Sequence, residues 1–273
     1  MKKCAFDPWT LWHLKDYLSS NGRYRLPKNL EQFVEHIGQL STKRRKILKK
    51  GTSFFRARIG PHPTKRQINP KDRNTLLPIK SYSGDEIKVP PFDKIKAGRA
   101  NAKGIGFLYL ASNEKTAIAE TRPWKGSLVS LVRFNLMKDL SVVSLTSKSK
   151  NVIPLFWLPF SGGINQCQYV KSFWAQIDAD FAEPISPEDS EIDYIPTQIL
   201  AEIFREYRAD GIIYKSAMQN TTGYNLVLFD EGSVAQDLNS PKLVKIKGVS
   251  YKSEPYEHPT LKILKNALKG MYS

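Results

Sequence analysis

Residues 211–229 carry the sequence GIIYKSAMQNTTGYNLVLF. Two apolar runs, 212–214 and 224–229, are rich in β-branched and aromatic residues, which favours strands. The polar loop from Lys215 to Gly223 separates them and carries Ser216 directly after the first run. This stretch therefore predicts two buried strands with a polar side chain at the end of the first.

The segment before this stretch predicts a helix. Apolar side chains recur at helical spacing over 196–207, and Asp210-Gly211 then turns the chain into the first strand. Further upstream, 128–134 and 140–145 have the composition of two more strands. Strands therefore outnumber helices in this half of the chain.

The segment 54–121 supplies another strand–helix set. Residues 54–59 read as a short strand that ends at Gly60-Pro61, and 106–111 read as a buried strand. Ser112-Asn113 followed by Glu114 is a typical helix start, so we expect a helix over 113–121 with Glu120 near its end. The prolines, lysines and glycines of 61–98 predict a long loop.

The remaining segments complete the expected fold. Helical spacing predicts helices over 9–19 and 29–50, with Gly51 as the stop. Within the Pro- and Trp-containing loop 146–193 we expect a strand at 168–177, and we expect a last strand over 243–251. The sum is a strand-dominated α+β fold with inserted helices. We expect an N-terminal helical extension over 1–51, a main domain over 52–235, and a basic C-terminal extension over 236–273 that packs on the core.

Composition narrows the class of protein. With 41% hydrophobic and 11% aromatic residues, the 273-residue chain has enough apolar material for a packed interior. The N-terminus does not develop a signal peptide and no apolar run approaches the ~20 residues that span a bilayer, so we expect a cytoplasmic protein without membrane contact. Two cysteines and four scattered histidines show no metal-ligand spacing, so we expect no metal.

The net charge of +16 is the compositional outlier. It would attract polyanions, anionic substrates or an acidic protein partner, and charge alone does not choose among them. The basic runs, Lys43-Arg44-Arg45-Lys46 above all, read either as a solvated surface or as a nucleic-acid face. Since no recognised nucleic-acid-binding motif accompanies them, we consider nucleic acid the weaker alternative.

Four segments follow one another along the chain: Phe55-Arg56-Ala57-Arg58, Gly98-Arg99-Ala100-Asn101 leading to 108–111, Ala117-Ile118-Ala119-Glu120, and Gly211 to Ser216 leading to 223–229. This ordered set resembles the RES-domain family, which is named for an arginine, a glutamate and a serine. The resemblance covers roughly residues 52–235 and assigns the three name-giving positions to Arg56, Glu120 and Ser216.

The resemblance has several implications. RES proteins are typically bacterial toxins that deplete NAD⁺ or transfer its ADP-ribose, and their fold is similar to that of ADP-ribosyltransferases. Many are paired with a helix-turn-helix antitoxin, so an Xre-type antitoxin is the partner implied here. A homo-oligomer is a further alternative, and the first 51 residues are a candidate docking or dimerisation element.

The chemistry of NAD⁺ cleavage can be matched to these residues directly. The nicotinamide ring of NAD⁺ is cationic while it is bound to ribose and leaves as a neutral molecule. The bond therefore breaks toward an oxocarbenium-like ribose, and the leaving group needs no general acid. A carboxylate beside the developing cation stabilises the transition state, and Glu120 is the candidate. It could also hold a ribose hydroxyl or activate a water.

The other site residues are assigned by the ligand groups they suit. A pyrophosphate favours a planar arginine, so Arg56 is the expected anchor and Arg99 a second clamp. Arg58 shares the strand face of Arg56 by the period of two, so which of them is the anchor stays open; the aromatics before Arg56 match the family's position. Ser216 is expected to bind a ribose or phosphate oxygen. The expected substrate-binding residues are completed by Tyr109, whose ring would face the nicotinamide, and by Asn101 and Asn225, which would brace the loops.

Each assignment has a structural alternative. Tyr109 could be a core residue, Glu120 an exposed helix charge, Ser216 a turn residue, and both arginines surface charges. At the level of function, the alternatives are a mono-ADP-ribosyltransferase that modifies a macromolecule and a non-catalytic basic nucleic-acid-binding protein.

Overall fold

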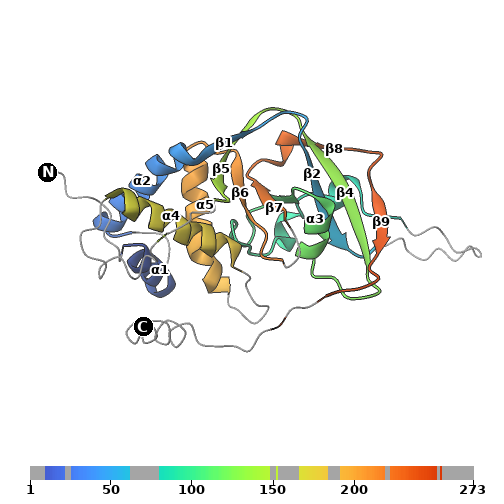
Figure 1. Ribbon diagram of the computed structural model, residues 1–273, viewed down its shortest axis with the longest axis horizontal. Helices are drawn as coiled ribbons and strands as arrows, with labels where there is room; N and C mark the ends of the chain where they lie inside the picture. Colours follow the sequence, from blue (N-terminus) through green and yellow to red (C-terminus); the bar gives the residue numbers. More distant parts are fainter. Residues whose placement is uncertain are drawn as a thin grey trace, which may run out of the picture.

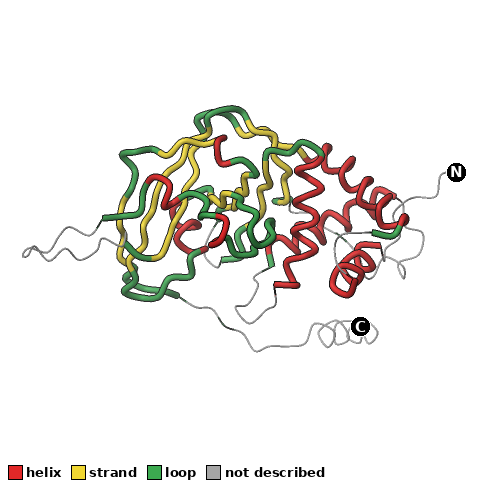
Figure 2. The backbone as a smooth tube through the Cα atoms, turned by 180° about the vertical axis from the view of Figure 1, so that it is seen from behind, coloured by secondary structure: helices red, strands yellow, loops and turns green. Residues whose placement is uncertain are grey.

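The computed structural model describes residues 10–21, 26–61, 80–147, 152, 166–183, 191–218, 222–250 and 253. Figure 1 shows an elongated molecule with helices gathered at one end and a large sheet at the other. The view from behind in Figure 2 shows the same division. The mixed α+β class expected from the sequence is confirmed, whereas the likeness to ADP-ribosyltransferases stays a prediction.

The sheet contains nine strands among the described residues, in the order β1-β5-β6-β7-β3-β2-β4-β8, with β9 also paired to β4. Only β5 and β6 are parallel within the described pairs. The strands are β1 (Arg45–Leu48), β2 (Ser53–Ile59), β3 (Leu108–Ala111), β4 (Leu128–Leu136), β5 (Leu140–Leu145), β6 (Gly211–Lys215), β7 (Tyr224–Leu228), β8 (Val234–Gln236) and β9 (Lys242–Lys245). The two runs of 211–229 form the antiparallel neighbours β6 and β7 in the interior of the sheet.

Helices cover one face of this sheet. The large helices are α1 (Thr10–Asn21), α2 (Lys28–Ser41), α4 (Gln166–Ala182) and α5 (Ile195–Glu206). Their apolar side chains form one buried cluster with Val143, Ile212 and Val227 of the sheet. The short helix α3 (Glu114–Glu120) packs through Ala117 on Ala111 and Leu131, further along the sheet (Figure 1).

The opposite face of the sheet has a second core. Phe54, Leu110, Phe134 and Leu226 lie in this core, and along β7 Leu226 alternates with Val227 of the first cluster, as the period of two requires. The segment after residue 80 contributes Ile87, at the end of the 3-10 helix Gly84–Ile87. This segment and a second 3-10 helix, Phe92–Lys94, belong to the predicted loop 61–98, of which residues 62–79 lie outside the described part.

The predicted strand at 168–177 is wrong, because these residues form the middle of α4. Their aromatic content favoured a strand, but Tyr169, Phe173, Ile177 and Phe181 recur every four residues and are all buried. This is the spacing of one helix face. The rest of the expected loop 146–193 is described only at 146–147, 152, 166–183 and 191–193.

The predicted helix over 29–50 is right only in its first part. The helix α2 ends at Ser41, and after the 3-10 turn Thr42–Arg44 the strand β1 pairs antiparallel with β5. Gly51, with a φ of 82°, is therefore not a helix stop but part of the turn between β1 and β2. Four residues assigned to the N-terminal extension thus belong to the sheet, while the division into domains stays a prediction.

The other expected elements in the described residues are present, with shifted ends. The last strand was predicted over 243–251, but β9 is shorter and runs over Lys242–Lys245, and β8 was not predicted. Trp9, Tyr251 and residues 254–273 lie outside the described part. In the segments that the structure describes, no helix has the length and apolar character needed to cross a membrane.

Candidate active site

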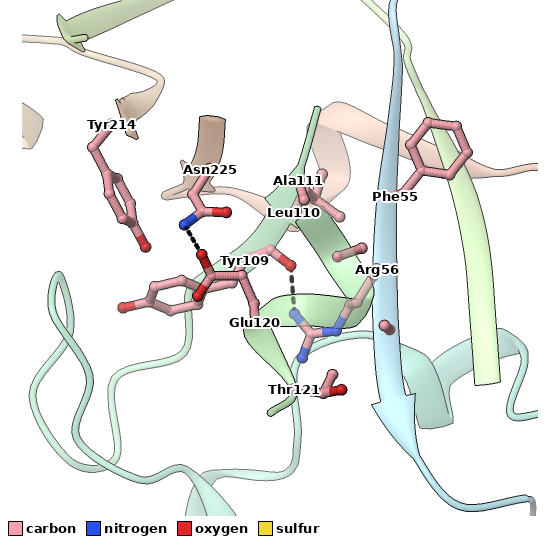
Figure 3. A pocket seen from close by; sticks show the side chains of 11 residues that line it. Phe55, Arg56, Tyr109, Leu110, Ala111, Glu120, Thr121, Tyr214 and Asn225 are labelled. Carbon is pink, nitrogen blue, oxygen red and sulfur yellow. Dashed lines mark hydrogen bonds between the residues drawn. The ribbon is translucent and has the colours of Figure 1, made fainter. Parts of the chain in front are cut away.

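A pocket of about 210 Å³ opens on the helix-covered face of the sheet, beside α3 (Figure 3). Strands β2, β3, β6 and β7 form its floor, and the last turn of α3 forms one wall. Its lining consists of Phe55, Arg56, Ala57, Tyr109, Leu110, Ala111, Ala117, Glu120, Thr121, Tyr214 and Asn225. Four of the seven predicted site residues, namely Arg56, Tyr109, Glu120 and Asn225, thus line one cavity.

Helix α3 is held over this pocket by its N-terminus. The side chain of Asn113 accepts a hydrogen bond from the Thr116 amide at 2.8 Å, which confirms the expected helix cap. The hydroxyl of Ser112 accepts from the Tyr224 amide at 2.9 Å, which ties the start of α3 to the start of β7. A Cβ on Gly223 would lie 2.1 Å from the Thr116 Oγ1, so only glycine permits this approach.

Glu120 is the last residue of α3 and has an exposed side chain. A helix C-terminus does not favour negative charge, so the stabilisation of this carboxylate has to come from elsewhere. Its Oε1 accepts one hydrogen bond from the Ser216 hydroxyl and one from the Asn225 amide, both at 2.7 Å. Among the described residues no hydrogen bond to Oε2 is found, so this oxygen is available to a ligand.

Sheet register explains why Asn225 and Glu120 meet. Asn225 pairs with Tyr214 of β6 on one side and with Ala111 of β3 on the other. Directly paired residues point to the same face, so Tyr214, Asn225 and Ala111 form a row on the face that α3 covers. Phe55 continues the row through its pairing with Ala111.

Arg56 fills the junction between β2 and β3. These strands pair at Phe55 and Ala111, and beyond this point the Arg56 guanidinium donates to the Tyr109 carbonyl at 3.0 Å and to the Lys88 carbonyl at 3.3 Å. Burial, together with the neighbouring charge of Arg58, lowers the pKa of Arg56 to about 10. A guanidinium has five N–H groups, so donors remain for an anionic ligand.

Tyr109 presents its ring and not its hydroxyl to the pocket. The hydroxyl donates to Asn101 Oδ1 at 2.7 Å and accepts from the Ala100 amide at 3.0 Å. Burial raises the pKa of Tyr109 above its usual value. The predicted site residue Asn101 therefore lies behind the pocket wall, where it is 4% exposed and holds Tyr109 in place.

Arg99, the predicted second clamp, and Arg58, the alternative anchor, do not line the pocket. The guanidinium of Arg99 donates to the carbonyls of Asp180 and Glu183 at the C-terminal end of α4, and Arg99 does not line the pocket. Arg58 is exposed, donates to the Glu86 carbonyl and stacks over the Tyr82 ring at 4.1 Å. Arg56 is thus the arginine in the pocket wall, and the second clamp expected at Arg99 is not brought to it.

Two residues that contribute to the site were not predicted. Tyr214 lines the pocket beside Glu120 and Asn225 (Figure 3), and its pairing with Asn225 could be inferred only once the strand register was known. Gln198 of α5 is 1% exposed and donates to the carbonyls of Gly98 and Asn101, both at 2.9 Å. The sequence predicts Gln198 only as part of a helix, because its hydrogen-bond partners lie about a hundred residues away in the sequence.

The two arginines of the basic run 43–46 have structural roles, whereas Lys43 and Lys46 are exposed. Arg44 forms an ion pair with Asp178 at 3.1 Å and lies over the Trp174 ring. The side chains of Arg44 and Asp178 are both mostly buried. Arg45 donates to the carbonyls of Tyr207 and Ser141 at 2.7 and 3.3 Å. These two arginines belong to the packing between β1 and the helices, which weakens the case for a nucleic-acid face there.

The described residues contain no group of three or more His, Cys, Asp or Glu side chains that could hold a metal ion. The pocket instead combines an exposed carboxylate, a partly buried guanidinium and aromatic walls. Such a set suits an organic ligand that carries hydroxyl and phosphate groups.

The sequence matches the RES domain over residues 81–245, which is more than half of the chain. The chain therefore belongs to the RES-domain family. The matched region includes Glu120, Ser216 and Asn225, whereas Arg56 lies before it, so the assignment of Arg56 depends on its place in the pocket.

Comparison with solved structures finds a chain of the M. tuberculosis MbcT-MbcA toxin-antitoxin complex, which is 11% identical in sequence with a TM-score of 0.38. The alignment covers 78% of this chain and 92% of that chain. Comparison with curated proteins gives no match.

Proposed function

We propose that this protein is a RES-domain toxin that cleaves the nicotinamide–ribose bond of NAD⁺. The observation that carries the proposal is the environment of Glu120, whose carboxylate faces a pocket with one oxygen held by two donors and the other unoccupied by described residues. Membership in the RES-domain family supports the same substrate class.

The proposed reaction places a negative charge where positive charge develops. When the bond between ribose C1′ and the nicotinamide nitrogen breaks, its electron pair moves to the nitrogen and neutralises the pyridinium ring. The ribose becomes an oxocarbenium-like cation, which the Glu120 carboxylate stabilises. Water or another nucleophile then adds to C1′ and loses its proton, and Glu120 is the group placed to accept it.

The dimensions of the pocket favour one end of the dinucleotide. Its volume of about 210 Å³ is below the roughly 300–1,000 Å³ typical of sites that enclose a whole drug-sized ligand. We therefore place the nicotinamide and its ribose inside, with the ring against Tyr109. Arg56 then lies in the wall with donors for the pyrophosphate.

Release of nicotinamide by the purified protein tests this proposal. We expect the parent chain to release it and Glu120→Gln to lose at least ~100-fold in rate, since the amide keeps the size of the side chain but removes its charge. Glu114→Gln is the matched control. Glu114 lies on the same helix but does not line the pocket, and it forms an ion pair with Lys242 at 2.7 Å. Equal rates for the parent and Glu120→Gln would contradict the role of Glu120.

The group that captures the ribose is a separate question. With NAD⁺ labelled in its adenylate, free ADP-ribose indicates hydrolysis and its 1″-phosphate indicates phosphorolysis. Label on protein or nucleic acid would instead identify a mono-ADP-ribosyltransferase.

The proposed reaction also predicts an effect on cell growth. Depletion of NAD⁺ would arrest growth when the protein is expressed, and Glu120→Gln would relieve the arrest. An antitoxin with a helix-turn-helix domain is the partner we propose, and its co-expression would restore growth with the parent chain. The high positive charge of this chain favours an acidic binding surface on that partner.

A further inference from the structure

Tyr214 is a pocket residue whose hydroxyl has no assigned role. The residue is 5% exposed, and its ring packs in the core with Phe181 at a centroid distance of 5.9 Å. In Figure 3 its hydroxyl end points toward Asn225, Glu120 and the Tyr109 ring. The core thus holds the ring, while the polar end reaches the reacting part of the pocket.

The hydroxyl of Tyr214 keeps its proton and can donate a hydrogen bond. Burial is the main cause of its raised pKa, and the neighbouring Tyr109 and the Glu120 charge act in the same direction. The Asn225 amide, placed on the same face by the strand pairing, opposes them by donating toward the Tyr214 oxygen. The phenol therefore keeps its proton, and no hydrogen bond from it to a described residue is found.

Glu120 and Tyr214 offer complementary groups side by side. The free Oε2 of Glu120 can only accept a hydrogen bond, whereas the Tyr214 hydroxyl has a proton to donate. A sugar hydroxyl both donates and accepts, so one such group satisfies both residues at once. A phosphate oxygen would be repelled by Glu120, and an apolar group would leave the Tyr214 proton unpaired.

We propose that Tyr214 and Glu120 together bind the 2′-hydroxyl of the nicotinamide ribose, with Tyr214 donating to it and Glu120 accepting from it. This inference rests on the proposed function, since it needs a ribose in the pocket. The 2′-hydroxyl is the one adjacent to C1′, so the same contact places C1′ beside the carboxylate. Tyr214 thereby selects ribose over deoxyribose at the reacting end of the substrate.

Tyr214→Phe tests the inference, because it removes the hydroxyl and keeps the ring in the core. With NAD⁺ we expect kcat/KM to fall roughly tenfold, mainly through KM, as for the loss of one hydrogen bond formed in the bound substrate. With the analogue that lacks the 2′-hydroxyl, we expect the parent and Tyr214→Phe to agree within about twofold. Tyr224→Phe is the matched control, since Tyr224 packs against Phe54 on the opposite face.

The outcomes separate this inference from the proposed function. If the parent releases nicotinamide from NAD⁺ and Tyr214→Phe is as fast, the Tyr214 inference is wrong and the proposed function stands. An equal loss on NAD⁺ and on the 2′-deoxy analogue also overturns it, because the hydroxyl would then act on something other than the 2′-position. If the parent releases no nicotinamide, both the proposed function and this inference are wrong.

Discussion

The hydroxyl of Ser216 donates a 2.7 Å hydrogen bond to Oε1 of Glu120, and the two residues are 96 positions apart in the sequence. Because a carboxylate can only accept, the direction of this bond is set. The Asn225 amide donates to the same oxygen, so both donors act on one side of the carboxylate. The other side is thereby directed into the pocket.

Removal of one of these donors should weaken the site without unfolding it. Ser216→Ala is expected to lower nicotinamide release by about ten- to a hundredfold, since a hydrogen bond to a charged group contributes roughly 1.5–3 kcal/mol. Steady-state kinetics with the parent, Ser216→Ala and Ser216→Thr measures this. A Thr variant as slow as the Ala variant would argue that the shape at this position matters and not the hydroxyl.

Arg56 and Arg58 should differ sharply when each is changed to lysine. An ammonium at position 56 cannot bind both the Tyr109 and the Lys88 carbonyl in a planar arrangement, so we expect a loss of roughly 1–3 kcal/mol in stability and a rise in KM. Arg58→Lys replaces an exposed side chain and should change stability and KM only a little. Urea unfolding and kinetics on the two variants decide it, and a reversed order would make Arg58 the anchor.

The loop behind Tyr109 should depend on Gln198. Gln198→Leu leaves the carbonyls of Gly98 and Asn101 without their side-chain donor, so we expect a loss of roughly 1–3 kcal/mol in the free energy of unfolding and a weaker hold on Tyr109. Thermal unfolding together with KM for NAD⁺ measures both effects. Gln39→Leu, at an exposed position on α2, is the control and should leave KM unchanged. A Gln198→Leu variant with parental stability would contradict the bracing role.

The basic run should matter for stability and not for nucleic-acid binding. Arg44→Ala leaves the buried Asp178 without its ion-pair partner, so we expect destabilisation of roughly 3 kcal/mol. Burial already raises the pKa of Asp178, and loss of Arg44 removes a charge that opposes this rise. Chemical unfolding measures the change. If Arg44→Ala instead kept full stability and lost salt-dependent affinity for DNA or RNA, the nucleic-acid alternative would regain support.

The end of α5 offers a stabilising substitution. Arg208 has a φ of 66°, in the left-handed region that glycine adopts without strain, and it is exposed. Arg208→Gly should therefore stabilise the fold by about 0.5–1 kcal/mol, which corresponds to roughly 1–4 °C in Tm for a domain of this size. Arg205→Gly, inside the helix, should lower Tm instead. Scanning calorimetry on both compares them, and a lower Tm for Arg208→Gly would contradict the argument.

Local patterns predicted most of the elements on which the site is built. The strands β2, β3, β6 and β7 and the capped helix α3 follow from short runs whose composition and turn residues point to one structure. The strand predicted at 168–177 failed because aromatic content and helical spacing pointed in different directions, and burial of one helix face decided between them. Likewise β1 was taken for helix because its pairing with β5 lies almost a hundred residues away.

The sequence by itself determined the chemical inventory: a carboxylate after a short capped helix, a serine after a buried strand, and arginines on an early strand. The tertiary structure alone decided which groups meet, because strand register sets the neighbours of each side chain. It brought Ser216 and Asn225 to Glu120, placed Arg56 and not Arg99 in the pocket wall, and added Tyr214. Contacts between segments this far apart arise from the packing of the whole sheet, which no local pattern encodes.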